Sequence, residues 1–278
     1  MANTKEAHMD TNKMCISITE KRILVAKINQ EEILQYQQSS TPAMFSDGIK
    51  KIKKMGKTLF QKEKIGQVIC SVAHPNHKDQ TFFDRRLPTW QDRPIGEILE
   101  KIFFCPVQLE NQFLLEALGE AIFGTNHTSR KTVAYYHLGR EVVAFKIQNQ
   151  KPPFPIPPLN PGSQLIDIGH GNAVKLSDLL SEDSLELKLG KNPEINNKEK
   201  FFDEITYSLA KGLHNTCLHW NPGVIVLGGT LAKEFPLGKL NEYLKNLGDG
   251  HKLPRIDKSS LNELADSYGA VVMLRHKS

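Results

Sequence analysis

Residues 106–124 read PVQLENQFLLEALGEAIFG and carry the strongest structural signal in the chain. Pro106 to Leu109 form a short apolar run that predicts a β-strand. The Leu-, Ala- and Glu-rich residues from Asn111 to Ile122 predict a helix. A strand that passes directly into a helix is typical of α/β proteins. The segments on both sides of this unit continue the same alternation.

The residues before this unit predict three successive strands and then an alternation of helices and strands. Met14 to Asn29 holds the apolar runs MCISI and RILVAKI, which are interrupted by Thr19-Glu20-Lys21, and the run ILQYQ follows. Strands so close in sequence indicate an antiparallel meander. The other predicted elements are a helix over Asp47–Lys64, a buried strand over Gln67–Ala73 and a helix over Pro94–Phe103.

The residues after this unit repeat the α/β theme. Residues 151–162, KPPFPIPPLNPG, contain six of the 15 prolines and predict an extended loop, because proline has no backbone N–H to donate. A long helix is predicted over Lys200–His219, with Phe201, Ile205, Leu209, Leu213 and Cys217 on one apolar stripe. The other predicted elements are hairpin strands over Thr132–Leu138 and Val142–Gln148, a short helix over Lys175–Leu180, a buried strand over Val224–Leu227 and a final helix over Leu261–Leu274.

These elements predict an α/β protein with two domains. We expect residues 1–13 to form a disordered tail, residues 14–115 an N-terminal domain and residues 116–278 a C-terminal domain. The last helix, over 261–274, is expected to pack back on the N-terminal domain. A cleft between two such halves is the default place for a binding site.

The charge balance is mildly basic. The chain of 278 residues has a net charge of +5, from 36 Lys and Arg against 31 Asp and Glu. The densest basic run lies between Lys50 and Lys64, where lysines alternate with apolar residues at helical spacing. We interpret this run as a helix with one buried stripe and one solvated basic face. Nucleic-acid binding is not expected, because no known reading motif accompanies the lysines.

The four cysteines indicate a reducing compartment rather than a metal site. Cys15, Cys70 and Cys105 stand among apolar neighbours, which is typical of buried free thiols, and no pair of cysteines has metal-ligand spacing. The N-terminal residues are polar, and no apolar run is long enough to span a membrane. We therefore expect a cytoplasmic protein that binds no metal and no membrane.

Several segments together resemble the ROK family of sugar kinases, repressors and related open reading frames. They are PVQLENQFLLEALGEAIFG, IDIGHG at 166–171 and NPGVIVLGGT at 221–230. RLPTW at 86–90 resembles the family's Asn-Leu-Pro-Gly-Trp segment, and YGAVVML at 268–274 resembles its closing helix. The order and spacing of these segments agree with those of the family from about Met14 to the end of the chain.

The resemblance implies a two-domain actin-like ATPase fold, related to ribonuclease H, with a central interdomain cleft. In this family ATP binds between the halves and a sugar binds deeper in the cleft, so a sugar and a nucleotide are the implied ligands. ATP and Mg are implied as cofactors only if kinase activity survives, and a homodimer is implied as the assembly.

Both phosphate loops of the family are altered in this chain. The first loop, Asp-x-Gly-Gly-Thr, aligns Ser17 with the Asp, and Thr19, Glu20 and Lys21 with Gly-Gly-Thr. Side chains obstruct the approach of backbone N–H groups to phosphate, and Glu20 adds a negative charge, so a plain surface turn is the favoured interpretation.

The second loop is rich in glycine in the family and keeps only one here. Leu138-Gly139-Arg140-Glu141 is followed by Val142 to Phe145, which reads as a strand. Arg140 could meet an anion, but an exposed hairpin arginine is the favoured interpretation.

The catalytic base of the family is also replaced. Its Glu-Asn-Asp triplet, in which the Asp accepts the proton of the sugar hydroxyl, reads Glu110-Asn111-Gln112 here. A carboxamide cannot accept that proton at neutral pH, so no catalytic residue is intact. Gln112 could still hydrogen-bond a hydroxyl. Asn111 could either orient a ligand or cap the helix that follows, and the sequence does not decide between the two.

The sugar-binding set is half kept. The family's Glu-x-Gly-His reads Asp167-Ile168-Gly169-His170. The resemblance implies that Asp167 and His170 contact the substrate, although a lone histidine is more often structural. Lys175 and Ser177 replace the Cys and the sugar-binding Glu of a later segment, so zinc binding is not expected.

The nucleotide-binding segment is the best preserved. Asn221-Pro222, the strand that follows, and Gly228, Gly229 and Thr230 match the family's adenosine segment. Two glycines allow a close approach of the backbone to an adenine ring. A strand, a tight turn and a helix are also ordinary in α/β proteins, and that alternative stays open.

Three functions compete. The first is a catalytically degenerate sugar-kinase-like protein with residual sugar or nucleotide binding. The second is an active ATP-dependent sugar kinase, similar to glucokinase, with non-standard residues. The third is an interaction scaffold without a ligand. The family residues that are lost belong to both phosphate loops, the base and the sugar site. The segments that are kept are RLPTW, the long helices and the strand before Gly228. This distribution favours the first function.

Overall fold

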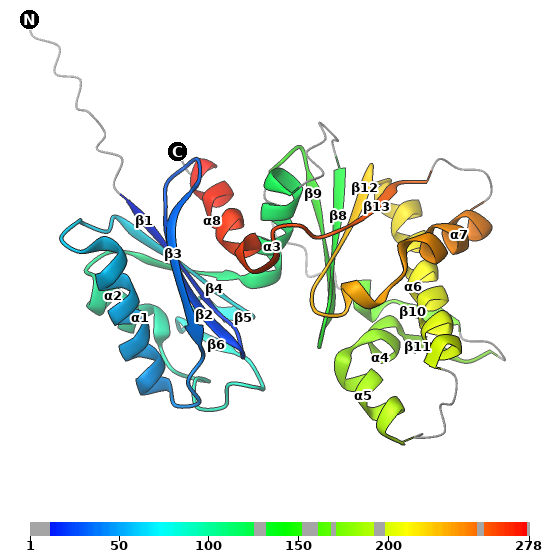
Figure 1. Cartoon of the computed structure of the whole chain (residues 1–278), viewed down its shortest axis with the longest axis horizontal. Coiled ribbons are helices and arrows are strands. Elements are labelled where there is room, and N and C mark those ends of the chain that lie inside the picture. Colours follow the sequence, from blue (N-terminus) through cyan, green and yellow to red (C-terminus); the bar gives the residue numbers. More distant parts are fainter. Residues whose placement is uncertain are drawn as a thin grey trace, which may run out of the picture. The chain divides into compact units, whose positions relative to one another are not determined.

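The chain is described by a computed structural model that covers residues 12–124, 132–151, 161–167, 171–191, 198–248 and 253–276 (Figure 1). It divides into two compact units. The first unit contains residues 1–119 and 263–278, and the second contains residues 120–262. None of the described helices is both long and apolar enough to cross a membrane.

A five-stranded sheet organises the first unit, in the order β3-β2-β1-β4-β7. The first three strands pair antiparallel, which confirms the predicted meander, and β4 and β7 continue the sheet in parallel with β1. The bounds are β1 Lys13–Ile18, β2 Arg22–Ile28, β3 Ile33–Ser40, β4 Gln67–Val72 and β7 Val107–Asn111.

Helices cover both faces of this sheet because its strand residues are apolar on both sides. Met14, Ile16 and Cys70 face α1 (Phe45–Phe60) and α2 (Ile95–Phe103), and Trp90 completes that core. The opposite face carries α8 (Ala265–Arg275), which packs against α3 (Gln112–Phe123). The RLPTW segment is anchored here, since Trp90 is fully buried and its indole donates a hydrogen bond to the carbonyl oxygen of Pro42.

Two glycines allow α3 and α8 to cross very closely. A Cβ atom on Gly119 would lie 2.0 Å from the carbonyl oxygen of Ala265, and one on Gly269 would lie 2.0 Å from that of Leu115. No side chain fits at these distances, so glycine is required at both positions for steric reasons.

The second unit is built on a four-stranded sheet in the order β13-β12-β8-β9. Helix α6 carries the predicted apolar stripe: Ile205, Leu209 and Leu213 are fully buried in the core, and Phe201 and Cys217 pack at its margin. The bounds are β8 Thr132–Leu138, β9 Val142–Gln148, β10 Leu165–Asp167, β11 Ala173–Lys175, α4 Leu176–Leu180, α5 Glu182–Lys191, α6 Lys198–Trp220, β12 Val224–Gly228, α7 Leu237–Leu247 and β13 Arg255–Lys258.

Several predicted boundaries were wrong. Helix α1 ends at Phe60 rather than Lys64, because Gln61 adopts a left-handed φ of 49°. The last helix starts at Ala265 rather than Leu261, because Asn262 has a φ of 49° and opens a 3₁₀ turn. Of the predicted extended loop, residues 152–160 lie outside the described residues. Sequence patterns also missed α5, α7, β10, β11, β13 and the hairpin of β5 (His74–Asn76) and β6 (Thr81–Phe83).

Candidate functional site

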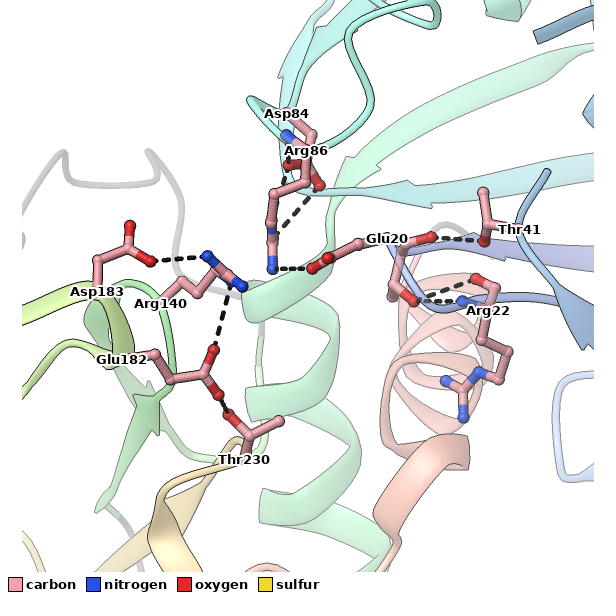
Figure 2. Close-up of polar contacts among 10 residues, drawn as sticks. Glu20, Arg22, Thr41, Asp84, Arg86, Arg140, Glu182, Asp183 and Thr230 are labelled. Atoms are coloured by element: carbon pink, nitrogen blue, oxygen red, sulfur yellow. Dashed lines mark hydrogen bonds and ion pairs between the residues drawn. The ribbon is translucent and has the colours of Figure 1, made fainter. Parts of the chain in front are cut away.

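The turn between β1 and β2 is closed by its own hydrogen bonds. The backbone N–H of Thr19 donates to the carbonyl oxygen of Arg22 at 2.9 Å, and the N–H of Arg22 donates back to Thr19 Oγ1 at 3.1 Å. Thr41 Oγ1 donates to the carbonyl oxygen of Thr19 at 2.6 Å (Figure 2). This is a hairpin turn of ordinary design, in which Thr19 and Arg22 use their N–H groups within the protein.

Glu20, at the tip of this turn, is paired with Arg86 (Figure 2). The distance from Arg86 Nη1 to Glu20 Oε2 is 3.1 Å, and Arg86 Nε lies 3.0 Å from Asp84 Oδ1. Asp84 is only 5% exposed, whereas Glu20 and Arg86 are each about one third exposed. Burial lowers the pKa of the Arg86 guanidinium, but the hydrogen bonds and charges of Asp84 and Glu20 outweigh burial and raise it. One cation is thus shared by two carboxylates of its own unit.

The turn between β8 and β9 is likewise closed by a backbone hydrogen bond and carries an arginine paired with carboxylates. The backbone N–H of Gly139 donates to the carbonyl oxygen of Glu141 at 3.2 Å, and β9 pairs antiparallel with β8, so the strand predicted over Val142 to Phe145 is confirmed. Arg140 Nη1 lies 2.7 Å from Asp183 Oδ1, and Arg140 Nε lies 3.4 Å from Glu182 Oε2 (Figure 2). Here too one arginine meets two carboxylates, but this arginine belongs to the turn itself and both carboxylates come from the first turn of α5.

Asn111 and Gln112 are both engaged at the start of α3. Asn111 Oδ1 accepts the backbone N–H of Leu114 at 3.0 Å, which is the geometry of a helix N-cap, and Asn111 Nδ2 donates to the carbonyl oxygen of Ala73 at 2.9 Å. Gln112 Nε2 donates to Glu116 Oε1 at 2.8 Å, one turn along the helix. The capping interpretation of Asn111 therefore has direct geometric support.

The two residues expected to contact a sugar are only partly described. Asp167 is the last residue of β10, which pairs antiparallel with β11, and His170 falls in residues 168–170, outside the described residues. Lys175 ends β11, and Ser177 lies in α4. Among the described residues, no group of three or more His, Cys, Asp or Glu side chains is placed to hold a metal ion.

The two glycines after β12 are needed by the packing of the second unit itself. A Cβ atom on Gly228 would lie 2.1 Å from Tyr135 Oη. Gly229 has a φ of +84°, and a Cβ atom there would lie 2.4 Å from the carbonyl oxygen of Leu138. Thr230 Oγ1 donates a hydrogen bond to Glu182 (Figure 2). The structural interpretation of this segment accounts for both glycines without a nucleotide.

A buried polar group below the first turn was not found from the sequence. Ser17, in the place of the family's loop Asp, is fully buried, and so is Ser71 on the neighbouring strand. Ser71 Oγ donates to Asp266 Oδ2 at 2.8 Å. Burial and the charge of Glu116 raise the pKa of Asp266, and the Ser17 and Ser71 hydroxyls and the charge of Arg22 partly oppose this. Asp266 comes from α8, far away in sequence, so no local pattern could have indicated it.

These contacts limit the chemistry of the two turns. An anion-binding turn needs backbone N–H groups and cations that are free to meet a phosphate. Here each arginine is already matched by two carboxylates, and Glu20 and Glu182 would repel an incoming phosphate. Asp84 and Asp183, which sequence analysis missed, complete the two clusters. The sequence places Asp84 close to Arg86 and Asp183 directly after Glu182, and it gives no other signal for these two residues.

Comparison with known proteins agrees with the resemblance. A family model described as "ROK family" matches residues 13–152, half of the chain. No curated protein sequence matches the chain.

Solved structures of ROK proteins are similar over nearly the whole chain. A ROK hexokinase from Thermus thermophilus has a TM-score of 0.80 at 17% identity and covers 96% of this chain and 99% of its own. A glucokinase from Streptomyces griseus, in complex with glucose and AMPPNP, has a TM-score of 0.71 at 15% identity over 95% and 99%. A family protein from Streptococcus pneumoniae, in complex with sucrose, has a TM-score of 0.75 at 19% identity over 96% and 99%. These similarities establish the actin-like ATPase fold.

Proposed function

Since the chain belongs to the ROK family and has the actin-like ATPase fold of its sugar kinases, we propose that it binds a sugar without transferring phosphate to it. The proposal makes it a catalytically degenerate member of the family. It rests on the contacts of the two turns that stand in the places of the family's phosphate loops, and on the residue that stands in the place of the base.

The ion pair between Glu20 and Arg86 carries the proposal. Glu20 stands where the family has a loop glycine, and Arg86 stands where the family has the Asn of its Asn-Leu-Pro-Gly-Trp segment. The two departures are therefore partners, 3.1 Å apart. A phosphate group at this turn would have to displace the Glu20 carboxylate and would then meet the buried charge of Asp84. The turn does not fit the phosphates of ATP.

The second turn supports the proposal in the same way. Arg140 replaces the loop Thr of the family, and the carboxylates of Glu182 and Asp183 already surround it. Gly228, Gly229 and Thr230 could still border an adenine ring. Without phosphate contacts that surface alone gives weak nucleotide binding.

The residue in the place of the family's base also supports the loss of phosphate transfer. Gln112 cannot accept the proton of a sugar hydroxyl, and its amide nitrogen already bonds Glu116 at 2.8 Å. Loss of a general base typically costs about 10²–10⁴-fold in rate. Asn111 and Gln112 keep polar groups that can bond sugar hydroxyls only if their present contacts to Leu114 and Glu116 are exchanged.

Part of the family's sugar-binding segment is retained in this chain. Asp167 keeps the negative charge and His170 the imidazole of the family's sugar-binding segment. The relatives from Streptomyces griseus and Streptococcus pneumoniae were solved with glucose and with sucrose. We therefore place sugar binding at Asp167 and His170. The interdomain cleft, the homodimer and the cytoplasmic location stay predictions.

A panel of melting curves tests the proposal. We expect glucose, mannose, N-acetylmannosamine or sucrose to raise the melting temperature, because a ligand at 100 times its Kd stabilises a protein by about 2.7 kcal/mol. ATP and ADP with Mg should give no shift. The variants Asp167→Ala and His170→Ala should lose the sugar response, whereas the exposed control His77→Ala should keep it. If no sugar gives a shift, the interaction-scaffold function replaces this one.

A further inference from the structure

Strand β3 is an edge of the sheet, and its pairing with β2 is regular except for a register shift at Lys27/Ile28. Among the described residues, no strand pairs with its outer side. Its sequence, ILQYQQSS, contains no charged residue and no proline. Natural proteins commonly block such edges with lysine, proline, bulges or short strands, because the outward backbone groups can pair with another chain. An edge of eight residues without charge or proline, in which only this one shift interrupts the pairing, can offer a surface for a partner.

A groove runs along this edge. Its cavity of about 520 Å³ is lined by residues 33–37 of β3, by Leu59 of α1, by Leu264, which immediately precedes α8, and by Tyr268 of α8. Leu34 is 41% exposed and Tyr36 is 45% exposed. Because α1 and α8 lie on opposite faces of the sheet, the groove has a wall on each side of the strand. An extended chain lying next to β3 would fill it.

Helix α1, which contributes Leu59 to the groove, and the residues that follow it are together strongly basic. Residues 45–66 carry seven lysines against Asp47 and Glu63, a net charge of +5, which equals the net charge of the whole chain. Lys51 Nζ donates to the carbonyl oxygen of Ser40, the last residue of β3, at 3.0 Å. Lys50, Lys53, Lys54 and Lys57 lie together on the exposed face of this helix.

The acidic residues of this segment do little to neutralise the lysines. The pair between Asp47 and Lys50, at 3.1 Å, is highly exposed and therefore weak. Glu63 is held by Lys27 at 2.7 Å. A second copy of the chain paired through β3 would bring a second segment 45–66 of the same +5 charge nearby, so the charge favours an acidic partner over self-association.

We propose that β3 binds an extended acidic segment of a partner polypeptide, which adds to the sheet as a sixth strand. Backbone hydrogen bonds to β3 hold the segment, alternate apolar side chains pack on Leu34 and Tyr36, and its carboxylates face the lysines of α1. This inference concerns a different surface from the sugar site. Its test therefore does not depend on whether the chain binds a sugar.

The test uses fluorescein-labelled nine-residue peptides and the full chain. A peptide of alternating Glu and Val should raise its fluorescence anisotropy with a Kd of about 10–100 μM in low salt, and binding should weaken about tenfold in 0.5 M salt. A Lys-Val peptide should not bind. A Glu-Val peptide with N-methylated backbone nitrogens should not bind either, because it cannot pair as a strand. Equal binding by either control overturns the proposal, as does failure of the Glu-Val peptide to bind at 1 mM.

Single substitutions place the peptide on the molecule. Tyr36→Ser and Lys54→Glu should each weaken binding by about threefold to tenfold. Lys101→Glu, at an exposed position on α2, should leave the Kd unchanged. All three side chains lie at the surface, so melting curves should confirm that the variants fold. If sedimentation instead shows a dimer that Tyr36→Ser dissociates, a second copy occupies the groove and the acidic-segment proposal is wrong.

Discussion

Changing Gly269 to alanine should destabilise the protein by about 3 kcal/mol or more. The new Cβ atom would lie 2.0, 2.5 and 2.6 Å from the carbonyl oxygen, carbonyl carbon and Cα of Leu115. All three are backbone atoms of α3, so no side chain can turn away to make room, and the two helices must separate. The gain of about 1 kcal/mol from replacing glycine in a helix cannot offset this. The midpoint of urea unfolding, followed by circular dichroism, measures the loss.

Gly190→Ala is the matched control. Gly190 lies in α5, and a Cβ atom there would meet nothing within 4 Å. The same change should be neutral or stabilise by up to about 1 kcal/mol, because only the helix propensity changes. If both variants unfold at the same urea concentration, α3 and α8 do not cross as closely at Gly269 as described.

Changing Arg86 to alanine should destabilise the protein by about 2 kcal/mol. The substitution leaves the carboxylate of Asp84, 5% exposed, without the cation that lies 3.0 Å away. Removing one partner of a fully buried pair costs about 3–5 kcal/mol. Arg86 is 32% exposed, so we reduce that value for solvent screening. Urea unfolding at neutral pH checks the prediction.

A double-mutant cycle with Glu20→Gln isolates the ion pair at the first turn. We expect the losses of Arg86→Ala and Glu20→Gln to be non-additive by about 0.5–1 kcal/mol, because each residue loses the same contact. Lys50→Ala provides the control, since its pair with Asp47 is 78% and 56% exposed and should contribute under about 0.5 kcal/mol. A loss for Arg86→Ala no larger than the loss for Lys50→Ala would mean that Arg86 does not hold the two carboxylates together.

Local patterns predicted most of the fold, but not the ends of its elements. MCISI, RILVAKI and ILQYQ predicted three paired strands, because apolar runs broken by short polar turns leave few alternatives. The end of α1 was mispredicted because the lysine-rich pattern continues past Phe60, whereas the backbone turns at Gln61. Helix α5 was missed because its sequence, EDSLELKLGK, is mostly polar. The resemblance to a family supplied the actin-like ATPase fold, which periodicity alone could not.

The candidate site was less predictable than the fold. The sequence identified Glu20, Arg140 and Gln112 as departures from the family, but their partners come from other elements. Arg86 is 66 residues away from Glu20, and Asp183 is 43 residues away from Arg140. The sequence allows Asn111 either to orient a ligand or to cap a helix, and it gives no sign of the bond from the N–H of Leu114 that the structure shows. Contacts between distant segments depend on the whole fold, and a single sequence gives no direct signal for them.

The most direct test of the account is ADP release from the purified protein with Mg-ATP and a panel of hexoses. Kinases typically turn over at about 1–100 s⁻¹. Because Gln112 stands in the place of the family's base and carboxylates pair with an arginine at each of the two turns, we predict release below about 0.01 s⁻¹ for every sugar. Gln112→Asp should not restore activity, because the turns are unchanged. Turnover of about 1 s⁻¹ or more with any hexose would contradict the account and identify an active sugar kinase.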